Sequence, residues 1–134
     1  MNIRYALEDD IDVLVKYDTH IKNEVLKESI FFNRVYVMEE NHNIVGILRY
    51  NLFWDNTPFL NLLYILEQYR NHKYGTYLMN YYENEMKRLG YSYLLLSTPS
   101  NETSKFFYQK LNYQEIGSLK YLNDPLEIVM AKEI

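Results

Sequence analysis

The fold is decided by the stretch Leu62–Thr76, LLYILEQYRNHKYGT, in which an apolar run passes into a short polar segment. The apolar run predicts a β-strand. Behind the polar segment, Leu78, Tyr82 and Met86 recur at helical spacing, and Gly90 stands where a C-terminal cap belongs. A helix that starts at a polar loop offers unpaired N–H groups, which bind phosphate. Because such junctions occur throughout α/β proteins, the stretch predicts a fold class and an anion site without identifying a function.

The residues before this stretch predict two helices and a set of antiparallel strands. The acidic turn Glu8–Asp10 favours a helix start, and apolar residues continue from there at helical spacing. The expected elements are a strand at Ile3–Leu7, a helix after residue 10, a helix from about His20 to Phe32, and strands at Val35–Met38, Ile44–Phe53 and Phe59–Leu66. Polar turns at 41–43 and 55–58 separate these strands, so consecutive strands are expected to pair antiparallel.

The residues after the stretch predict a buried strand, a second helix and two closing strands. Tyr91–Ser97 is apolar enough to be buried on both faces, and the strand–helix–strand order implies a right-handed crossover and a parallel pair. A helix at Glu102–Leu111 is expected to be capped by Asn101, to face Phe107 and Leu111 inward, and to end at a left-handed Asn112. Tyr113–Ser118 and Glu127–Ala131 are the expected closing strands, joined by a turn at 123–125.

Composition limits the classes of function. A chain of 134 residues is long enough for one domain, here residues 1–134, and too short for two. The net charge of -4 and the scattered Lys and Arg residues argue against a nucleic-acid partner. The absence of cysteine rules out disulfides and thiolate metal sites, and His20, His42 and His72 lack metal-ligand spacing, so no metal site is expected. With no apolar run for a leader or a membrane helix, we expect a cytoplasmic protein without a membrane partner.

Two motifs resemble those of the GNAT acetyltransferase superfamily. The pyrophosphate loop of that family runs Arg or Gln, two residues, Gly, one residue, Gly or Ala, and the segment Arg70–Gly75 follows it, with Lys73 at the first glycine position. Glu67 stands where the family often has proline. Downstream, Asn101–Tyr113, NETSKFFYQKLNY, is similar to the family stretch of Asn, a Phe–Tyr pair and Lys–Leu–Gly–Phe. The resemblance covers essentially the whole chain in the correct order.

The resemblance implies a fold and a coenzyme. The expected fold is a single α/β (α+β) domain of GNAT type, with a mixed, mostly antiparallel sheet, splayed central parallel strands and flanking helices. Acetyl-CoA would be the co-substrate, its pantetheine arm lying between the splayed strands. The residues that the resemblance assigns to coenzyme binding are Ile65, Leu66, Arg70, Asn71, His72, Lys73, Tyr74, Gly75, Thr76, Asn101, Phe107, Tyr108 and Lys110.

The resemblance also implies direct acetyl transfer to an amine in a ternary complex. The N–H of Leu66 would polarise the thioester carbonyl, and Tyr108 matches the tyrosine that protonates the departing thiolate. A tyrosine with a pKa near 10 remains protonated at neutral pH. The general base stays open among Glu24, Glu28, Asp55, Tyr64, Glu67 and a water chain. The aromatic residues Phe31, Phe32, Tyr36, Tyr50, Phe53 and Trp54 are either core or the lining of an acceptor pocket.

Two other functions remain compatible with the sequence. One is a non-catalytic module of the same fold that senses acyl-CoA or binds a partner, which the lysine at position 73 makes worth considering. The other is an unrelated α/β interaction domain, which would not bind CoA at all. The sequence leaves open the acceptor amine, the length of the acyl chain, and the choice between a monomer and a homodimer.

Overall fold

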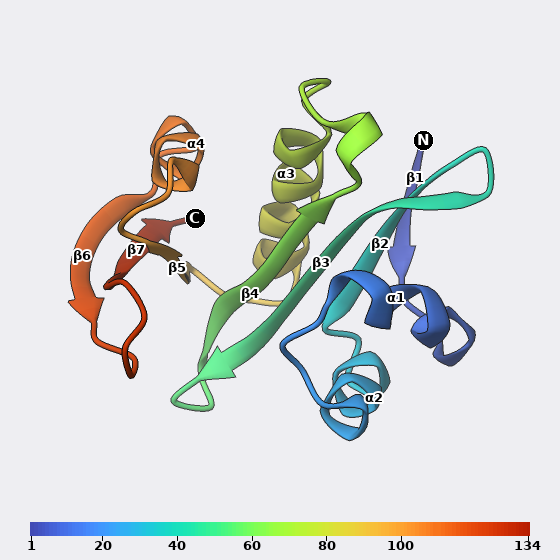
Figure 1. The fold of residues 1–134 in the computed structure, drawn as a ribbon, viewed down its shortest axis with the longest axis horizontal. Coiled ribbons are helices and arrows are strands. Elements are labelled where there is room, and N and C mark those ends of the chain that lie inside the picture. Colours follow the sequence, from blue (N-terminus) through green and yellow to red (C-terminus); the bar gives the residue numbers. More distant parts are fainter.

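The computed structural model describes residues 1–134, which form one seven-stranded sheet flanked by helices (Figure 1). The strands are β1 (Asn2–Tyr5), β2 (Val35–Glu40), β3 (Asn43–Phe53), β4 (Thr57–Ile65), β5 (Tyr93–Pro99), β6 (Gln114–Leu119) and β7 (Glu127–Glu133), in the spatial order β1-β2-β3-β4-β5-β7-β6. All neighbours pair antiparallel except β4 and β5, which are parallel. This mixed sheet confirms the predicted fold class.

Four α-helices cover the two faces of the sheet. They are α1 (Ile11–Tyr17), α2 (Asn23–Phe31), α3 (Tyr74–Arg88) and α4 (Ser104–Lys110), and short 3-10 helices span Glu8–Asp10 and Glu67–Tyr69. Figure 1 shows α1 and α2 in front of β2 and β3, whereas α3 lies behind the sheet. No helix is long and apolar enough to cross a membrane.

Each face has its own hydrophobic core. The core under α3 and α4 contains Leu78, Met79, Tyr82 and Met86 from α3, packed on side chains of β2, β3, β4 and β5. The core under α1 and α2 contains Leu14, Leu26 and Ile30, packed on Val35, Val37 and Ile47. Alternate residues of β2 and β3 therefore point to opposite cores, which is why these strands read as nearly continuous apolar runs.

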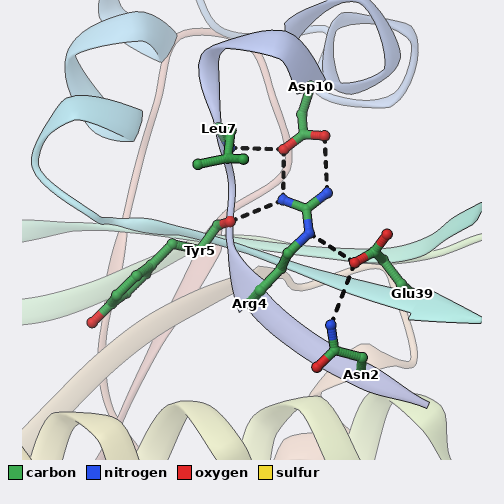
Figure 2. A network of polar contacts seen from close by, with 6 residues as sticks. All are labelled: Asn2, Arg4, Tyr5, Leu7, Asp10 and Glu39. Atoms are coloured by element: carbon green, nitrogen blue, oxygen red, sulfur yellow. Dashed lines mark hydrogen bonds and ion pairs between the residues drawn. The ribbon is translucent and has the colours of Figure 1, made fainter. Parts of the chain in front are cut away.

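An ion-pair network fixes the N-terminal strand to the elements around it (Figure 2). The Arg4 guanidinium donates to both oxygens of Asp10, at 2.8 and 3.1 Å, and through Nε to Glu39 on β2 at 2.7 Å. The backbone N–H of Leu7 also donates to Asp10, at 2.7 Å. The hydrogen bond from Arg4 holds the pKa of Asp10 below its usual value. Arg4 thus joins β1 to β2 and to the start of α1.

Several element boundaries differ from the sequence prediction. The first strand ends at Tyr5 instead of Leu7, because Ala6 and Leu7 already lead into the acidic turn. The second helix starts at Asn23, three residues later than expected, and β5 starts at Tyr93 instead of Tyr91. Helix α4 starts at Ser104 instead of Glu102 with Thr103 as its N-cap, so the prediction that Asn101 caps it is wrong. Asn101 lies in a turn in which Glu102 N–H donates to the Pro99 carbonyl.

Candidate functional site

The central parallel strands separate next to a β-bulge in β4. They pair only at Phe59 with Leu95 and Leu60 with Leu96. On the other side of β4, Arg49 of β3 pairs with Leu62 and Tyr50 with Leu60, so Asn61 is an extra residue without a partner in the ladder. A bulge bends its strand and increases the local twist. The bulge therefore explains why β4 leaves β5 directly after Leu60, which opens a split between the two strands.

The register past the bulge decides which peptide groups face the split. The N–H of Leu66 donates to the Val45 carbonyl at 2.9 Å. Bonded and non-bonded pairs alternate in an antiparallel ladder, so the peptide groups of Ile65, one residue earlier, point to the opposite edge of β4. The prediction that the Leu66 N–H acts on the thioester is therefore wrong, since β3 already uses that group. Ile65 presents its N–H on the side of β4 that β5 has left.

Arg70 links the loop after β4 to the end of this strand. Its Nε donates to the Ile65 carbonyl at 2.8 Å, and its guanidinium carbon lies 5.2 Å from the centre of the Tyr64 ring. Tyr64 in turn packs on Tyr17 of α1, with ring centres 5.1 Å apart. The arginine that opens the predicted phosphate loop thus lies at the split, against one edge of β4.

Two non-glycine residues of the loop, Asn71 and Lys73, have backbone conformations that favour glycine. Asn71 and Lys73 both have a φ of 65°, and Lys73 has a ψ of 17° as the N-cap of α3. No side chain caps this helix end. The first N–H groups of a helix lack intrahelical partners, so those at the start of α3 are available to an anion. Lys73 therefore reproduces the backbone of the glycine that the resemblance expects there.

Helix α4 forms the second wall of the site and packs closely on the start of α3. A Cβ atom added at Gly75 would lie 3.4 Å from the Phe107 ring, an ordinary van der Waals distance, so Phe107 reaches the start of α3. Tyr108, the next residue, is 9% exposed and packs on Phe107 and Tyr113. Its hydroxyl makes no hydrogen bond with the protein, and burial raises its pKa to about 12.

The loop, α3 and α4 enclose a cleft of about 640 Å³. Its lining comprises Ile65, Tyr69, Arg70, Asn71, Lys73, Tyr74, Gly75, Thr76, Phe107, Lys110 and Leu111. Three of these residues are basic and none is acidic, in a chain whose net charge is -4. The structure therefore gathers positive charge at the start of α3, and the cleft suits an elongated ligand with several negative charges and an apolar part.

The cleft brings together most of the residues predicted to bind the coenzyme, but not all. Asn101 lines a neighbouring hollow of about 680 Å³ that reaches the cleft through Arg70. His72 is exposed beside the Tyr74 ring, while Leu66 and Tyr108 do not line the cleft. Sequence reasoning missed Tyr69 and the bulge at Asn61, because nothing in the sequence marks Asn61 as an unpaired residue. Leu111 faces inward as predicted, but the sequence does not assign it to the cleft.

The candidates for the general base occupy different environments. Glu24, Glu28, Asp55 and Glu67 are exposed, whereas Tyr64 is half-buried beside Tyr17 and Arg70. On the same face of the sheet, the Arg49 guanidinium forms a bidentate ion pair with Asp18 at 2.6 and 3.2 Å, and this pair attaches the end of α1 to β3. Tyr64 and the Arg70 guanidinium are therefore the groups at the end of β4 beside the split, and the Asp18 carboxylate on this face is already paired.

The aromatic cluster divides into two groups. Tyr36 and Tyr50 are 0% and 4% exposed and belong to the core under α3. Phe31 and Trp54 are each 80% exposed, on α2 and on the β3–β4 turn. The core interpretation is therefore correct for the two tyrosines and wrong for Phe31, Phe32, Phe53 and Trp54, which are all exposed.

Comparisons with known proteins agree with this geometry. The model of the acetyltransferase (GNAT) family matches residues 5–113. The structure of Ard1 from Thermoplasma volcanium is similar at a TM-score of 0.86 and 14% identity, over 99% of this chain and 97% of that one. The structure of an aminoglycoside 6'-N-acetyltransferase complexed with coenzyme A is similar at a TM-score of 0.80 and 20% identity, over 99% of this chain and 97% of that one. The structure of a GNAT family acetyltransferase from Elizabethkingia anophelis with acetyl-CoA bound is similar at a TM-score of 0.77 and 16% identity, over 99% of this chain and 97% of that one. No curated protein matches the chain in sequence.

Proposed function

Because the chain belongs to the GNAT acetyltransferase family, we propose that it is an N-acetyltransferase that moves the acetyl group of acetyl-CoA directly to an amine within a ternary complex. The observation that carries this proposal is the split between β4 and β5 beside a cleft lined by Arg70, Lys73 and Lys110. Acetyl-CoA supplies an activated thioester, and the residues of the site fit its parts.

The polar half of the cleft fits the diphosphate of the coenzyme. The N–H groups at the start of α3, around Tyr74 and Gly75, provide donors, and Lys73 adds a charge next to them. Arg70 and Asn71 complete this wall. Lys73 has the left-handed backbone conformation that a glycine would adopt at this position. Its ammonium adds a positive charge for the diphosphate that a glycine could not provide.

The split fits the pantetheine arm, which would pair with the free edge of β4 as an added strand does. The edge offers the N–H of Ile65, the last residue of the strand. In this proposal the Ile65 amide, in place of that of Leu66, donates to the thioester carbonyl and stabilises the negative charge that develops on its oxygen. Phe107 closes the apolar side of the cleft and excludes water.

Tyr108 is the proposed general acid. Burial raises its pKa to about 12, so the hydroxyl carries its proton throughout the neutral range. Its proton would pass to the sulfur as the carbon–sulfur bond breaks, leaving the thiol of free CoA and a tyrosinate that solvent reprotonates. No side chain of the protein forms a hydrogen bond with this hydroxyl, and Tyr108 as a whole is 9% exposed.

The acceptor amine must lose a proton before it attacks, because an alkyl ammonium has a pKa near 10.4. Tyr64, near the end of β4 between Tyr17 and the Arg70 guanidinium, has no partner on its hydroxyl. We assign it the role of orienting a water that accepts the proton, since a tyrosine itself is a weak base at neutral pH.

A thiol-release assay tests the proposal. The protein is incubated with acetyl-CoA and a panel of small amines, polyamines, aminoglycosides and peptides with free N-termini, while calorimetry measures CoA binding separately. We expect CoA to bind and at least one amine to accelerate thiol release. Binding without turnover across the panel would favour the non-catalytic acyl-CoA module, and the absence of CoA binding would reject both functions.

A further inference from the structure

The two walls of the cleft carry their positive charges at different places. Arg70 and Lys73 lie on the wall that begins α3. Lys110 lies on the opposite wall, in the last turn of α4, and it makes no hydrogen bond or ion pair with the protein. Phe107, one turn earlier on α4, contacts the start of α3. Lys110 therefore faces the cleft as an uncompensated cation beside an apolar surface.

The diphosphate alone does not account for this cation. If the amides of α3 and Lys73 hold the diphosphate, as the proposed function requires, its charge is already matched on the first wall. Lys110 then lies without a partner one helix away, where desolvation by a bound ligand would cost free energy unless an anion met it. Coenzyme A carries a second anionic group, the 3'-phosphate, on the ribose that adjoins its diphosphate.

We propose that Lys110 binds the 3'-phosphate of the coenzyme and makes the protein selective for CoA over 3'-dephospho-CoA. The inference rests on the proposed coenzyme site. It adds the residue that distinguishes CoA from 3'-dephospho-CoA, which has the same thiol but lacks the 3'-phosphate. A Lys ammonium near a phosphate dianion forms a charge-assisted hydrogen bond. No carboxylate lines the cleft, so no acidic side chain there competes with the phosphate for Lys110.

A neighbouring lysine offers a matched control. Lys105 lies on the same helix, but its ammonium is 3.9 Å from Glu115 and 5.4 Å from the centre of the Phe106 ring, and it does not line the cleft. Replacement of either lysine by glutamine removes one positive charge from α4. Only Lys110→Gln removes a charge from the cleft, so the pair separates a local contact from a general loss of positive potential.

The test measures the Kd of CoA and of dephospho-CoA by calorimetry for the wild type, Lys110→Gln and Lys105→Gln, with melting temperatures to verify folding. We expect the wild type to bind CoA about tenfold more tightly than dephospho-CoA, and Lys110→Gln to bind both with the weaker affinity. Lys105→Gln should keep the wild-type preference.

Three outcomes would overturn the inference. If Lys110→Gln weakened the binding of CoA and of dephospho-CoA equally, Lys110 would lie at the diphosphate. If the variant weakened the binding of neither ligand, Lys110 would not contact the coenzyme. A wild type that binds the two ligands with equal affinity would show that the 3'-phosphate is not recognised. If the wild type bound neither ligand, the proposed function itself would fail, and this result is distinct from the other three.

Discussion

Lys73 combines an unfavourable backbone with a useful charge. Its φ of 65° lies in the left-handed region, which costs a residue with a Cβ about 1 kcal/mol relative to glycine. We expect Lys73→Gly to raise the free energy of unfolding by about 0.5–1 kcal/mol, because part of the gain is offset by the greater freedom of glycine in the unfolded chain. CoA binding should weaken at the same time. Urea unfolding and calorimetry measure the two effects.

Asn71 provides the comparison, because it has the same φ of 65° but asparagine tolerates this conformation better. Asn71→Gly should therefore stabilise the protein less than Lys73→Gly and should leave the charge of the cleft unchanged. If Lys73→Gly lowered stability, the lysine side chain would be making contacts that outweigh its backbone strain.

Tyr108 is the residue on which the chemical step depends. Replacement of Tyr108 by phenylalanine removes only the hydroxyl, so we expect kcat to fall about a hundredfold while the Kd of CoA stays within a factor of about two. Because burial raises the pKa of Tyr108 to about 12, the group stays protonated as the pH rises, and its ionisation should not lower kcat at any pH at which the protein remains folded. Steady-state rates across alkaline pH measure this.

The phenylalanine variant distinguishes a catalytic hydroxyl from a packing ring. The ring of Tyr108 contacts Phe107 and Tyr113 and would do so equally in the variant. Unchanged kcat in Tyr108→Phe would remove this hydroxyl from the mechanism and leave proton donation to solvent.

At the level of elements, α3 is tied to β7 by a buried polar network. Glu83 accepts hydrogen bonds from Tyr113 at 2.9 Å and from the Lys132 ammonium at 2.7 Å, and it is 8% exposed. Lys132→Met would leave the Glu83 charge buried without its cation. We expect the free energy of unfolding to fall by about 2 kcal/mol, less than the roughly 3–5 kcal/mol for a fully buried pair because a fifth of the Lys132 side chain is exposed.

A double variant separates the loss of the pair from the loss of packing. Glu83→Gln added to Lys132→Met removes the remaining charge but keeps an acceptor for Tyr113, so it should restore at least half of the lost stability in urea unfolding. If the double variant were less stable than Lys132→Met alone, the Glu83 carboxylate would not be the source of the penalty.

The elements also show where sequence reasoning succeeds. Hydrophobic periodicity identified every main helix and strand, and Asn112 (φ 72°) and Gly90 (φ 97°) take the left-handed conformations predicted for helix ends. It failed at the bulge of Asn61, because an extra residue in a strand leaves no mark in a sequence that is apolar on both sides of it. The error at Leu66 follows from this failure, since the bulge and the register determine which amides face the split.

For the whole molecule, the order of the motifs allowed the family and the sheet to be predicted, whereas the acceptor side could not be. The residues at the start of α3 act through backbone conformation and a local charge, and such features are encoded in a short segment. The opposite side of the split includes Tyr17 and Tyr64, which come from α1 and β4 and meet only in the folded chain. No spacing in the sequence connects them.

The tyrosines of the core should make the whole fold sensitive to alkali. Burial raises the pKa of Tyr36, Tyr50, Tyr82, Tyr108 and Tyr113 above the ordinary value of 10. A group whose pKa is higher in the folded state contributes stability that is complete below its unfolded pKa and is lost as the pH rises toward the folded value. Each buried tyrosine then removes about 1.4 kcal/mol per pH unit above pH 10.

Five such groups together remove roughly 7 kcal/mol per pH unit, comparable to the total stability of a small domain, so unfolding is expected within about two pH units above 10. During an alkaline titration the circular dichroism signal should be lost in one cooperative step, and the tyrosinate absorbance of the buried tyrosines should rise in that same step. Ionisation of all the tyrosines while the helical signal persists would mean that solvent reaches these hydroxyls in the folded protein.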